Sequence, residues 1–196
     1  MRIIKKSYQS MKDEALIISL SKGDQKAFNE IYERYAGPLM GFFMRKMWND
    51  REKAEDFVHD FFAKIIRKPA SFDPTRSFKT WAYSVANNMC KNEYKKQEVR
   101  KNTTSGLDRF YSLKDENSNV MNQVQDAQFK NRFDQELNAL KEKHRDVFYL
   151  KNIKGLSIKE IAEIVETSEG TVKSRLFYAT KYLSDKLKEF NPVLNQ

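Results

Sequence analysis

Apolar residues recur at helical spacing in two blocks of the chain, and the polar stretch between the blocks shows no such period. The clearest stripe follows Asp50, where apolar positions lie three and four residues apart. This spacing places the positions on one face of an α-helix, and that face is expected to be buried. They are Ala54, Phe57, Val58, Phe61, Phe62, Ile65 and Ile66.

Local signals divide the first block into four expected helices. Asp24 and Asp50 are typical N-cap residues, so a helix is expected to begin after each of them. Pro38 predicts that the helix after Asp24 is interrupted or bent. The proline-rich sequence KPASFDPTRS predicts a loop at residues 68–77, and the fourth helix is expected from Phe78 to about Gln97.

The stretch from residue 100 to residue 120 is polar and carries balanced charge, so it is predicted to be a flexible linker. Phe110 and Tyr111 are candidate anchors within it. Because the chain has only 6 Gly and 4 Pro and few alternating β-branched runs, we expect it to be mostly helical. The predicted fold class is all-α, with two small helical domains at residues 13–99 and 121–190 joined by the linker.

A helix-turn-helix is predicted near the end of the second domain. Gly155 ends one helix, and Ser157 with Glu160 forms the pattern of a capping box at the start of the next. Thr167 or Ser168 then begins a second helix. Its apolar residues, together with those of the preceding helix, are expected to face inward, and they are Ile158, Ile161, Ala162, Val165, Val172 and Leu176, with Ala179 or Thr180.

The outward face of this second helix has the chemistry of a DNA-reading surface. In such motifs the second helix enters the major groove, where arginine can bind guanine and lysine or serine can contact phosphates or bases. The alternative is an ordinary corner between two helices, and the basic outer face together with a formal net charge of +9 favours DNA binding. The candidate contacts are Thr171, Lys173, Ser174, Arg175 and Tyr178.

A second candidate nucleic-acid surface lies on the fourth expected helix. Amides, an aromatic ring and lysines on one face suit single-stranded DNA, because bases stack on rings or bond to amides while lysines hold the backbone. In the alternative interpretation Tyr83 belongs to the core and the lysines form a solvated face. The candidate residues are Tyr83, Asn87, Asn88, Lys91, Asn92, Lys95 and Lys96.

Acidic residues cluster on the third expected helix. Glu55, Asp56, His59 and Asp60 share one face because they lie three and four residues apart. Three interpretations remain open: a carboxylate–histidine metal site, a solvated face, or a docking surface for a protein partner. A second set of metal ligands is not evident elsewhere, so no metal and no cofactor is expected.

Cysteine content and hydropathy bear on the compartment. The single cysteine, Cys90, has no partner for an internal disulfide. The N-terminal residues lack the apolar run of a signal peptide, and no stretch approaches the roughly 18 apolar residues of a membrane span. We therefore expect a soluble cytoplasmic protein that does not insert into a membrane.

Taken together, these residues resemble the extracytoplasmic-function (ECF) class of bacterial RNA polymerase sigma factors. Members of that class carry two helical domains joined by a flexible linker. The resemblance covers the chain from about Gly23 to Leu187 and is specific because the stretches occur in the family's order and spacing. They are AFNEIYERYAGPLMGFFMRKM, AEDFVHDFFAKIIRKP, SFKTWAYSVANNMCKNEYKK and GLSIKEIAEIVETSEGTVKSRLFYA.

The resemblance implies a role for each candidate surface. The first domain would dock on the clamp of the largest subunit of core RNA polymerase through Asp56, His59, Asp60 and Phe62. It would also recognise and help melt the minus-ten element of the promoter, with the loop at residues 72–77 helping to form a pocket for a flipped base. The minus-ten contacts implied are Tyr83, Asn88, Lys91, Asn92, Lys95 and Lys96.

The second domain would read the minus-thirty-five element through Thr171, Lys173, Ser174, Arg175 and Tyr178. The resemblance thus implies a transcription initiation factor without catalysis of its own. Its partners would be core RNA polymerase, promoter DNA and an anti-sigma factor.

The chain departs from the family pattern at several positions. His59 replaces the usual glutamine, and Ile66 stands where relatives often have tryptophan. Glu166 occupies a turn position where glycine is common, which costs about 1 kcal/mol in a left-handed backbone. Residues that relatives often have as basic side chains are here Phe177, Tyr178, Thr180 and Tyr182, which predicts weaker and less salt-sensitive upstream binding.

Two other functions are compatible with parts of the sequence. A stand-alone helix-turn-helix regulator would share the DNA-reading helix, although the first block lacks the strand–helix alternation of a receiver domain. A metal-dependent nuclease would use Asp56, His59 and Asp60.

Overall fold

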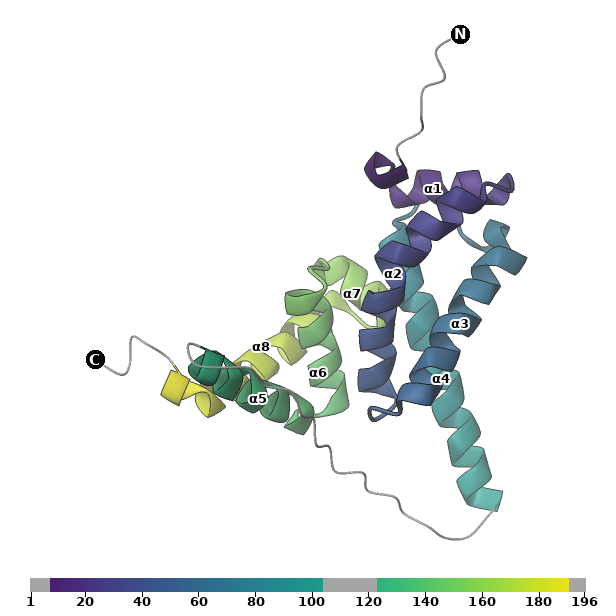
Figure 1. Ribbon diagram of the computed structural model, residues 1–196. Coiled ribbons are helices and arrows are strands. Elements are labelled where there is room, and N and C mark those ends of the chain that lie inside the picture. Colours follow the sequence, from purple (N-terminus) through teal and green to yellow (C-terminus); the bar gives the residue numbers. More distant parts are fainter. Residues whose placement is uncertain (1–7, 104–122, 191–196) are drawn as a thin grey trace. The chain divides into compact units, whose positions relative to one another are not determined.

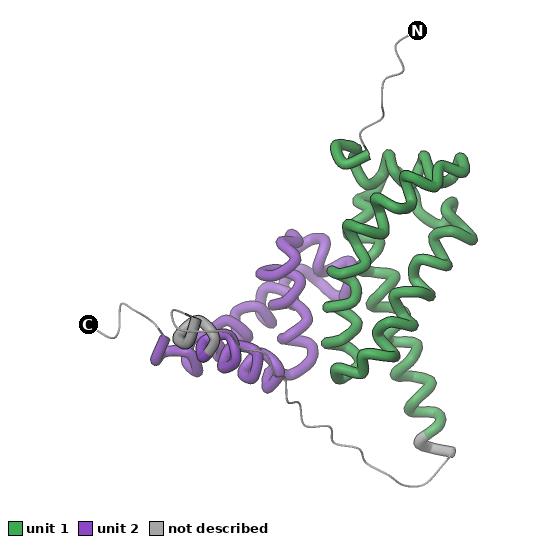
Figure 2. Tube along the Cα trace, in the orientation of Figure 1, with its two compact units in different colours: residues 1–113 green, residues 114–196 purple. Residues whose placement is uncertain are grey.

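The computed structural model describes residues 8–103 and 123–190, which form helices and turns without any strand. The chain divides into two compact units, residues 1–113 and 114–196 (Figure 2). The predicted all-α class is therefore confirmed. The first unit contains α1 (Asp13–Ser21), α2 (Gln25–Lys46), α3 (Arg51–Arg67) and α4 (Phe78–Thr103), and the second contains α5 (Gln123–Ala139), α6 (Glu142–Phe148), α7 (Ile158–Ile164) and α8 (Glu169–Lys186).

The linker was predicted to begin at residue 100, but α4 continues to Thr103 and does not end near Gln97. Residues 104–120 of that prediction, with Phe110 and Tyr111, lie outside the described residues.

The first unit is built around α2, which contacts each of the other three helices (Figure 1). Leu39 and Phe43 of α2 are 0% exposed, and the Phe43 ring lies 5.3 Å from that of Phe57 on α3. In Figure 1, α1 lies across one end of α2, and the C-terminal half of α4 projects beyond the ends of α2 and α3.

Both predicted N-caps of this unit are confirmed. The Asp24 carboxylate accepts hydrogen bonds from the backbone N–H groups of Lys26 and Ala27, and the Asp50 carboxylate accepts one from that of Lys53. The interruption predicted at Pro38 is wrong, since α2 runs through it. Tyr35 and Leu39 on either side of the proline are buried, and their packing offsets the one backbone hydrogen bond that proline removes.

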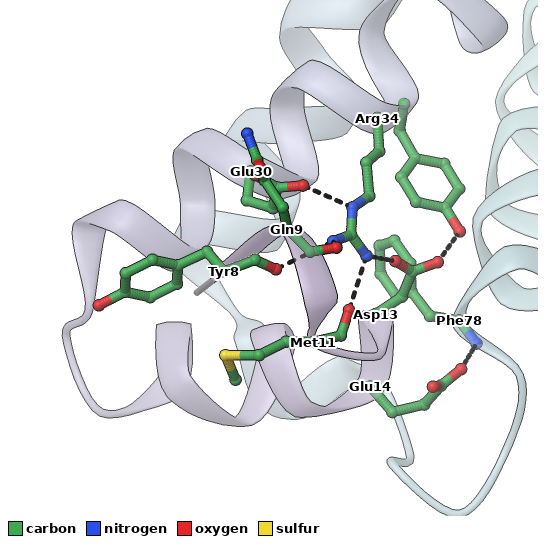
Figure 3. Close-up of polar contacts among 9 residues, drawn as sticks. Tyr8, Gln9, Met11, Asp13, Glu14, Glu30, Arg34 and Phe78 are labelled. Carbon is green, nitrogen blue, oxygen red and sulfur yellow. Dashed lines mark hydrogen bonds and ion pairs between the residues drawn. The ribbon is translucent and has the colours of Figure 1, made fainter. Parts of the chain in front are cut away.

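An arginine of α2 fixes the N-terminal segment to the unit (Figure 3). The Arg34 guanidinium donates to the carboxylates of Asp13 at 2.6 Å and Glu30 at 2.8 Å. Its remaining N–H groups donate to three backbone carbonyl oxygens of the N-terminal segment. These belong to Tyr8 at 3.0 Å, Gln9 at 2.9 Å and Met11 at 2.9 Å.

Two carboxylates at the start of α1 extend this network toward α4 (Figure 3). Asp13 also accepts a hydrogen bond from the Tyr35 hydroxyl. Burial, and then that bond, raise the pKa of Tyr35. Glu14 accepts a hydrogen bond of 2.9 Å from the backbone N–H of Phe78, the first residue of α4. The first turn of α1 therefore holds the point where the 68–77 loop enters α4.

Removal of this arginine is expected to destabilise the first unit. Arg34→Ala leaves two partly buried carboxylates without their cation and should lower the free energy of unfolding by about 2 kcal/mol. Urea unfolding followed by tryptophan fluorescence measures this unit alone, because the two tryptophans of the chain, Trp48 and Trp81, both lie in it.

Arg51→Ala is the matched control. Arg51 pairs with Glu55 on the surface, where the two side chains are 79% and 48% exposed, so its loss should cost less than about 0.5 kcal/mol. Equal effects of the two substitutions would contradict the role given to the Arg34 network.

The second unit is organised around α8, which contacts α5, α6 and α7. Leu137 and Leu140 of the α5–α6 region pack with Ala179 and Leu183 of α8. A short π-helical stretch, Tyr149–Ile153, extends α6. Gly155 then turns the chain in the left-handed conformation, with φ +67°, toward α7.

Most of the inward positions predicted for the helix-turn-helix are confirmed. Ile161, Ala162, Val172 and Ala179 are buried, whereas Thr180 is exposed. Ile164 is also buried, although the sequence pattern did not select it. The remaining inward positions are half-buried, and they are Ile158, Val165 and Leu176.

The turn between α7 and α8 contains the left-handed residue that the sequence suggested. Glu166 has φ 53°, which costs a side-chain-bearing residue roughly 1–2 kcal/mol. Glu166→Gly is expected to raise the melting temperature of the second unit by roughly 4–8 °C, measured by circular dichroism of the full chain. Glu163→Gly inside α7 should instead lower it. A lower melting temperature for Glu166→Gly would contradict the assignment of strain.

Candidate nucleic-acid and partner-binding surfaces

The acidic face predicted on α3 is present and fully on the surface. Asp56, His59 and Asp60 are exposed, and their spacing places them on one stripe of the helix. Ile66 continues this stripe seven residues after His59, and its side chain is 54% exposed. Its predicted place in the core is wrong. The surface is therefore acidic at one end and apolar at the other, a composition suited to a protein partner.

Phe62, which was expected on the same surface, is buried with 3% of its side chain exposed. Its ring lies 4.6 Å from the ring of Tyr32 and 5.9 Å from that of Phe28, both on α2. The prediction that Phe62 makes a direct docking contact is wrong. Phe62 joins α3 to α2 behind the acidic face, while Tyr32 remains 39% exposed beside it.

The amide and lysine face predicted on α4 is present without its aromatic ring. Asn88, Asn92, Lys95 and Lys96 are exposed, and Lys91 is half-buried. Their side chains follow one another along the helix at three- and four-residue spacing, so they form a continuous polar strip.

Tyr83 does not belong to this strip. Its side chain is 1% exposed, and its ring packs 5.5 Å from that of Phe42. Asn87 is also buried, at 4% exposure. The prediction fails because Tyr83 and Asn87 lie on the buried side of α4 together with Ala86 and Cys90, so the interpretation of Tyr83 as a core residue holds.

The loop before α4 is anchored by aromatic packing at both of its ends. Phe72 is buried, and its ring lies 5.3 Å from that of Phe78 and 5.4 Å from that of Trp81. Between these anchors Asp73 accepts hydrogen bonds from the backbone N–H and hydroxyl of Thr75. Residues 73–77 are exposed, so the loop presents polar groups from a fixed base.

The turn formed by Asp73 and Thr75 also affects the ionisation of Asp73. The hydrogen bond from the Thr75 backbone, and then that from its hydroxyl, lower the pKa of Asp73 below its ordinary value. The carboxylate is therefore ionised at neutral pH.

Capping sets the start of both helices of the helix-turn-helix. Ser157 and Glu160 form the predicted capping box at α7. Ser168 accepts a hydrogen bond of 3.2 Å from the backbone N–H of Thr171 and so caps α8. The Thr171 hydroxyl is 2.9 Å from the Ser168 hydroxyl, which ties this predicted contact residue to the cap.

The predicted contact residues of α8 form an exposed centre with two half-buried edges. Lys173, Ser174 and Tyr178 are exposed, whereas Thr171 and Arg175 are half-buried. The exposed centre also holds a phenylalanine, because 63% of the Phe177 side chain is accessible and its ring lies 5.5 Å from that of Tyr178.

Two further side chains around α8 have structural contacts. The His144 ring of α6 stacks on Tyr178, with 6.1 Å between centroids and 20° between planes. The sequence pattern did not select His144, since no local signal marks a contact across 34 residues. Tyr182 donates a hydrogen bond of 2.8 Å to Glu136 of α5, so it stabilises the unit instead of facing outward.

Within residues 8–103 and 123–190, no group of three or more histidine, cysteine or acidic side chains is arranged to hold a metal ion. In the same residues, every helix is too short or too polar to cross a membrane.

Each of the two units matches a known protein family. The family described as Sigma-70 region 2 matches residues 31–100, and the family described as Sigma-70, region 4 matches residues 130–183. The ECF RNA polymerase sigma factor SigW of Bacillus subtilis is 30% identical over 179 residues, which are 88% of this chain and 95% of that protein. The chain belongs to the ECF family of RNA polymerase sigma factors.

Other relatives of this sigma factor cover equally large parts of it. The ECF sigma-E factor of Haemophilus influenzae is 28% identical over 191 residues, covering 92% of this chain and 97% of the relative. The sigma-E factor of Escherichia coli strain K12 is 29% identical over 187 residues, covering 92% and 96%.

Solved structures share the fold. CnrH in complex with the cytosolic domain of CnrY matches with a TM-score of 0.62 and 23% identity over 90% of this chain and 97% of that one. RpoE of Bartonella quintana, in complex with the anti-sigma factor NepR, matches with a TM-score of 0.63 and 24% identity over 83% and 98%.

The family ranges place the candidate surfaces of this sigma factor in two different regions. The acidic face of α3 and the polar strip of α4 both fall within the match to region 2, and the exposed face of α8 falls within the match to region 4. The apolar pattern did not predict that Ile66 is exposed. Its position two helical turns after the exposed His59 indicates that both residues share a face.

Proposed function

We propose that this sigma factor binds core RNA polymerase, directs it to promoters with a two-part recognition sequence and helps to open the DNA at the downstream part. The observation that carries the proposal is the presence of regions 2 and 4 on one chain, in order, with relatives aligned over about nine-tenths of it. A stand-alone regulator is not supported, because it would need no region 2.

The α3 surface is proposed to dock on the clamp of the largest polymerase subunit. Asp56, His59 and Asp60 supply exposed polar and charged contacts, and Ile66 supplies an apolar one. Phe62 keeps α3 packed on α2 and acts on docking only through that packing.

The strip on α4 and the preceding loop are proposed to bind the minus-ten element. Asn88 and Asn92 can donate to and accept from bases, while Lys91, Lys95 and Lys96 lie along the same helix to neutralise phosphates. The loop from Phe72 to Ser77, held by buried rings at its base, would accept a base flipped out of the helix.

The face of α8 is proposed to read the minus-thirty-five element in the major groove. Lys173, Ser174 and Arg175 supply donors, and the Phe177–Tyr178 pair supplies apolar surface for thymine methyl groups. Because these rings replace cations, fewer phosphates are neutralised and the contact should depend less on salt.

Further properties of the proposal follow from the family. The protein acts without catalysis of its own and works in the cytoplasm, where polymerase and DNA are found. We also propose an anti-sigma factor as a regulator, supported by the solved relative RpoE, which is bound to the anti-sigma factor NepR.

Transcription in vitro tests the proposal. Purified chain added to core polymerase should produce transcripts from a distinct set of genomic start sites, each preceded by two shared sequence elements. Transcription that is unchanged by the chain, at every promoter of the genome, would exclude this function.

A further inference from the structure

The turn between α2 and α3 exposes a tryptophan whose backbone conformation is energetically unfavourable. The Trp48 side chain is 59% exposed. Both Trp48, with φ 50°, and Asn49, with φ 59°, adopt the left-handed conformation, which is uncommon for a bulky residue and costs roughly 1–2 kcal/mol. A glycine or asparagine would form the same turn more cheaply at position 48. The backbone conformation therefore does not favour an indole at this position.

The indole is supported by a rigid framework. Its ring centroid lies 5.3 Å from that of Tyr94 on α4, at an angle of 50°. The Tyr94 hydroxyl donates a hydrogen bond of 2.5 Å to the backbone carbonyl of Lys46, the last residue of α2. The turn itself is closed by a hydrogen bond of 2.8 Å from the Asn49 N–H to the carbonyl of Met44. The tryptophan is thus held in place from α2 and from α4.

Exposed charges of both signs lie close to this aromatic pair in the sequence, and Asp50 follows Trp48 by two residues. Lys95 and Lys96 directly follow Tyr94 on α4 and are exposed. The neighbouring acid, Glu93, is neutralised by Lys53 of α3 at 2.5 Å. Partial burial opposes ionisation of Glu93, but hydrogen bonds from Lys53 and Gln97 outweigh it and lower its pKa. An exposed ring beside two exposed lysines is a composition found on surfaces that bind nucleic acid.

We propose that Trp48, backed by Tyr94, is a stacking platform for an unpaired base of promoter DNA. A base presents the π-face that an indole binds only when the duplex is open. Tyr94 lies on α4 between Lys91 and Lys95, so a strand held by these lysines can place a base on the turn between α2 and α3. This inference rests on the proposed binding of the minus-ten region by α4.

Crosslinking in the polymerase holoenzyme tests the platform. Thymines of the non-template strand are replaced one at a time by 5-iodouracil, the open complex is irradiated, and the modified peptides are mapped by mass spectrometry. We expect one position to crosslink to Trp48. Trp48→Asn, which suits the left-handed backbone but lacks a ring, should abolish that crosslink.

Affinity supplies the second measurement. Binding of single-stranded non-template oligonucleotide to the holoenzyme should weaken about 5- to 100-fold with Trp48→Asn and much less with Trp48→Tyr. Ile18→Ala removes another exposed apolar side chain of the first unit, 40% accessible and located on α1, and should leave binding unchanged. Fluorescence of the remaining Trp81 during urea unfolding verifies that the Trp48→Asn unit is folded.

The possible results separate this inference from the function on which it rests. If Asn88→Ala weakens binding while Trp48→Asn does not, the platform is excluded and the α4 interface stands. If neither substitution matters, both proposals fail. If Trp48→Asn weakens only the assembly with core polymerase, the turn binds protein, and the platform is excluded.

Discussion

Substitution of Asp56 by arginine is expected to weaken the binding of this sigma factor to core RNA polymerase at least tenfold, which corresponds to about 1.4 kcal/mol. Asp56 is exposed at the centre of the acidic face of α3. Reversal of its charge places a cation against a surface that is complementary to acids, and such like-charge contacts cost more than the loss of one ion pair. Competition with a labelled sigma factor for core polymerase measures the change.

The fold should not change, because the Asp56 side chain contributes to no buried contact. Glu33→Arg on α2 is the matched control: Glu33 is exposed, and the substitution alters the net charge by the same amount. An unchanged polymerase affinity of Asp56→Arg would refute the docking surface. Equal losses in both variants would show that net charge, not the α3 face, determines binding.

Arg175→Ala is expected to reduce initiation at promoters that carry the upstream element by about 1–3 kcal/mol, or roughly 5- to 100-fold, if the side chain reads a base. The effect should be small at promoters that lack this element. Arg175 is half-buried at the edge of the exposed centre of α8, close in sequence to the cap of the helix. Transcription in vitro from paired promoters with and without the element gives the ratio directly.

Lys181→Ala on the same helix is the control for loss of charge. Lys181 is exposed six residues after Arg175 and three after Tyr178, where a lysine meets phosphate, so its removal should lower binding slightly and at all sequences alike. A uniform loss in Arg175→Ala, equal for both promoters of the pair, would assign Arg175 to phosphate contact and exclude its role in base recognition.

Features set by neighbouring residues were predictable from the sequence. The caps at Asp24 and Asp50 and the capping box of Ser157 and Glu160 depend on side chains two or three positions away, so their patterns predict them correctly. The left-handed turn at Glu166 was suggested by the family pattern.

Features set by packing between helices were not predictable in the same way. Phe62 and Ile66 both lie at an edge of the apolar stripe of α3, and only contact with Phe28 and Tyr32 of α2 decides that Phe62 is buried. Tyr83 is likewise buried by Phe42. A helical period defines the direction of a stripe to within about one residue, and one residue is enough to exchange core and surface.

Long-range polar contacts leave no periodic signal at all. Arg34 and Asp13 are 21 positions apart, yet their ion pair fixes the N-terminal segment. The exposed Trp48 is similar, because its left-handed conformation and its contact with Tyr94 arise from the meeting of α2, α3 and α4.

We propose that the two DNA-binding surfaces act together only on the polymerase. Each makes weak contacts alone, and assembly on one scaffold raises the effective concentration of the second after the first has bound. Titration of a labelled promoter duplex with the free chain and with the holoenzyme measures this directly. We predict at least hundredfold tighter binding by the holoenzyme, accompanied by opening of the minus-ten region. Equally tight binding by the free chain, with no gain from polymerase, would show that the two surfaces do not depend on polymerase.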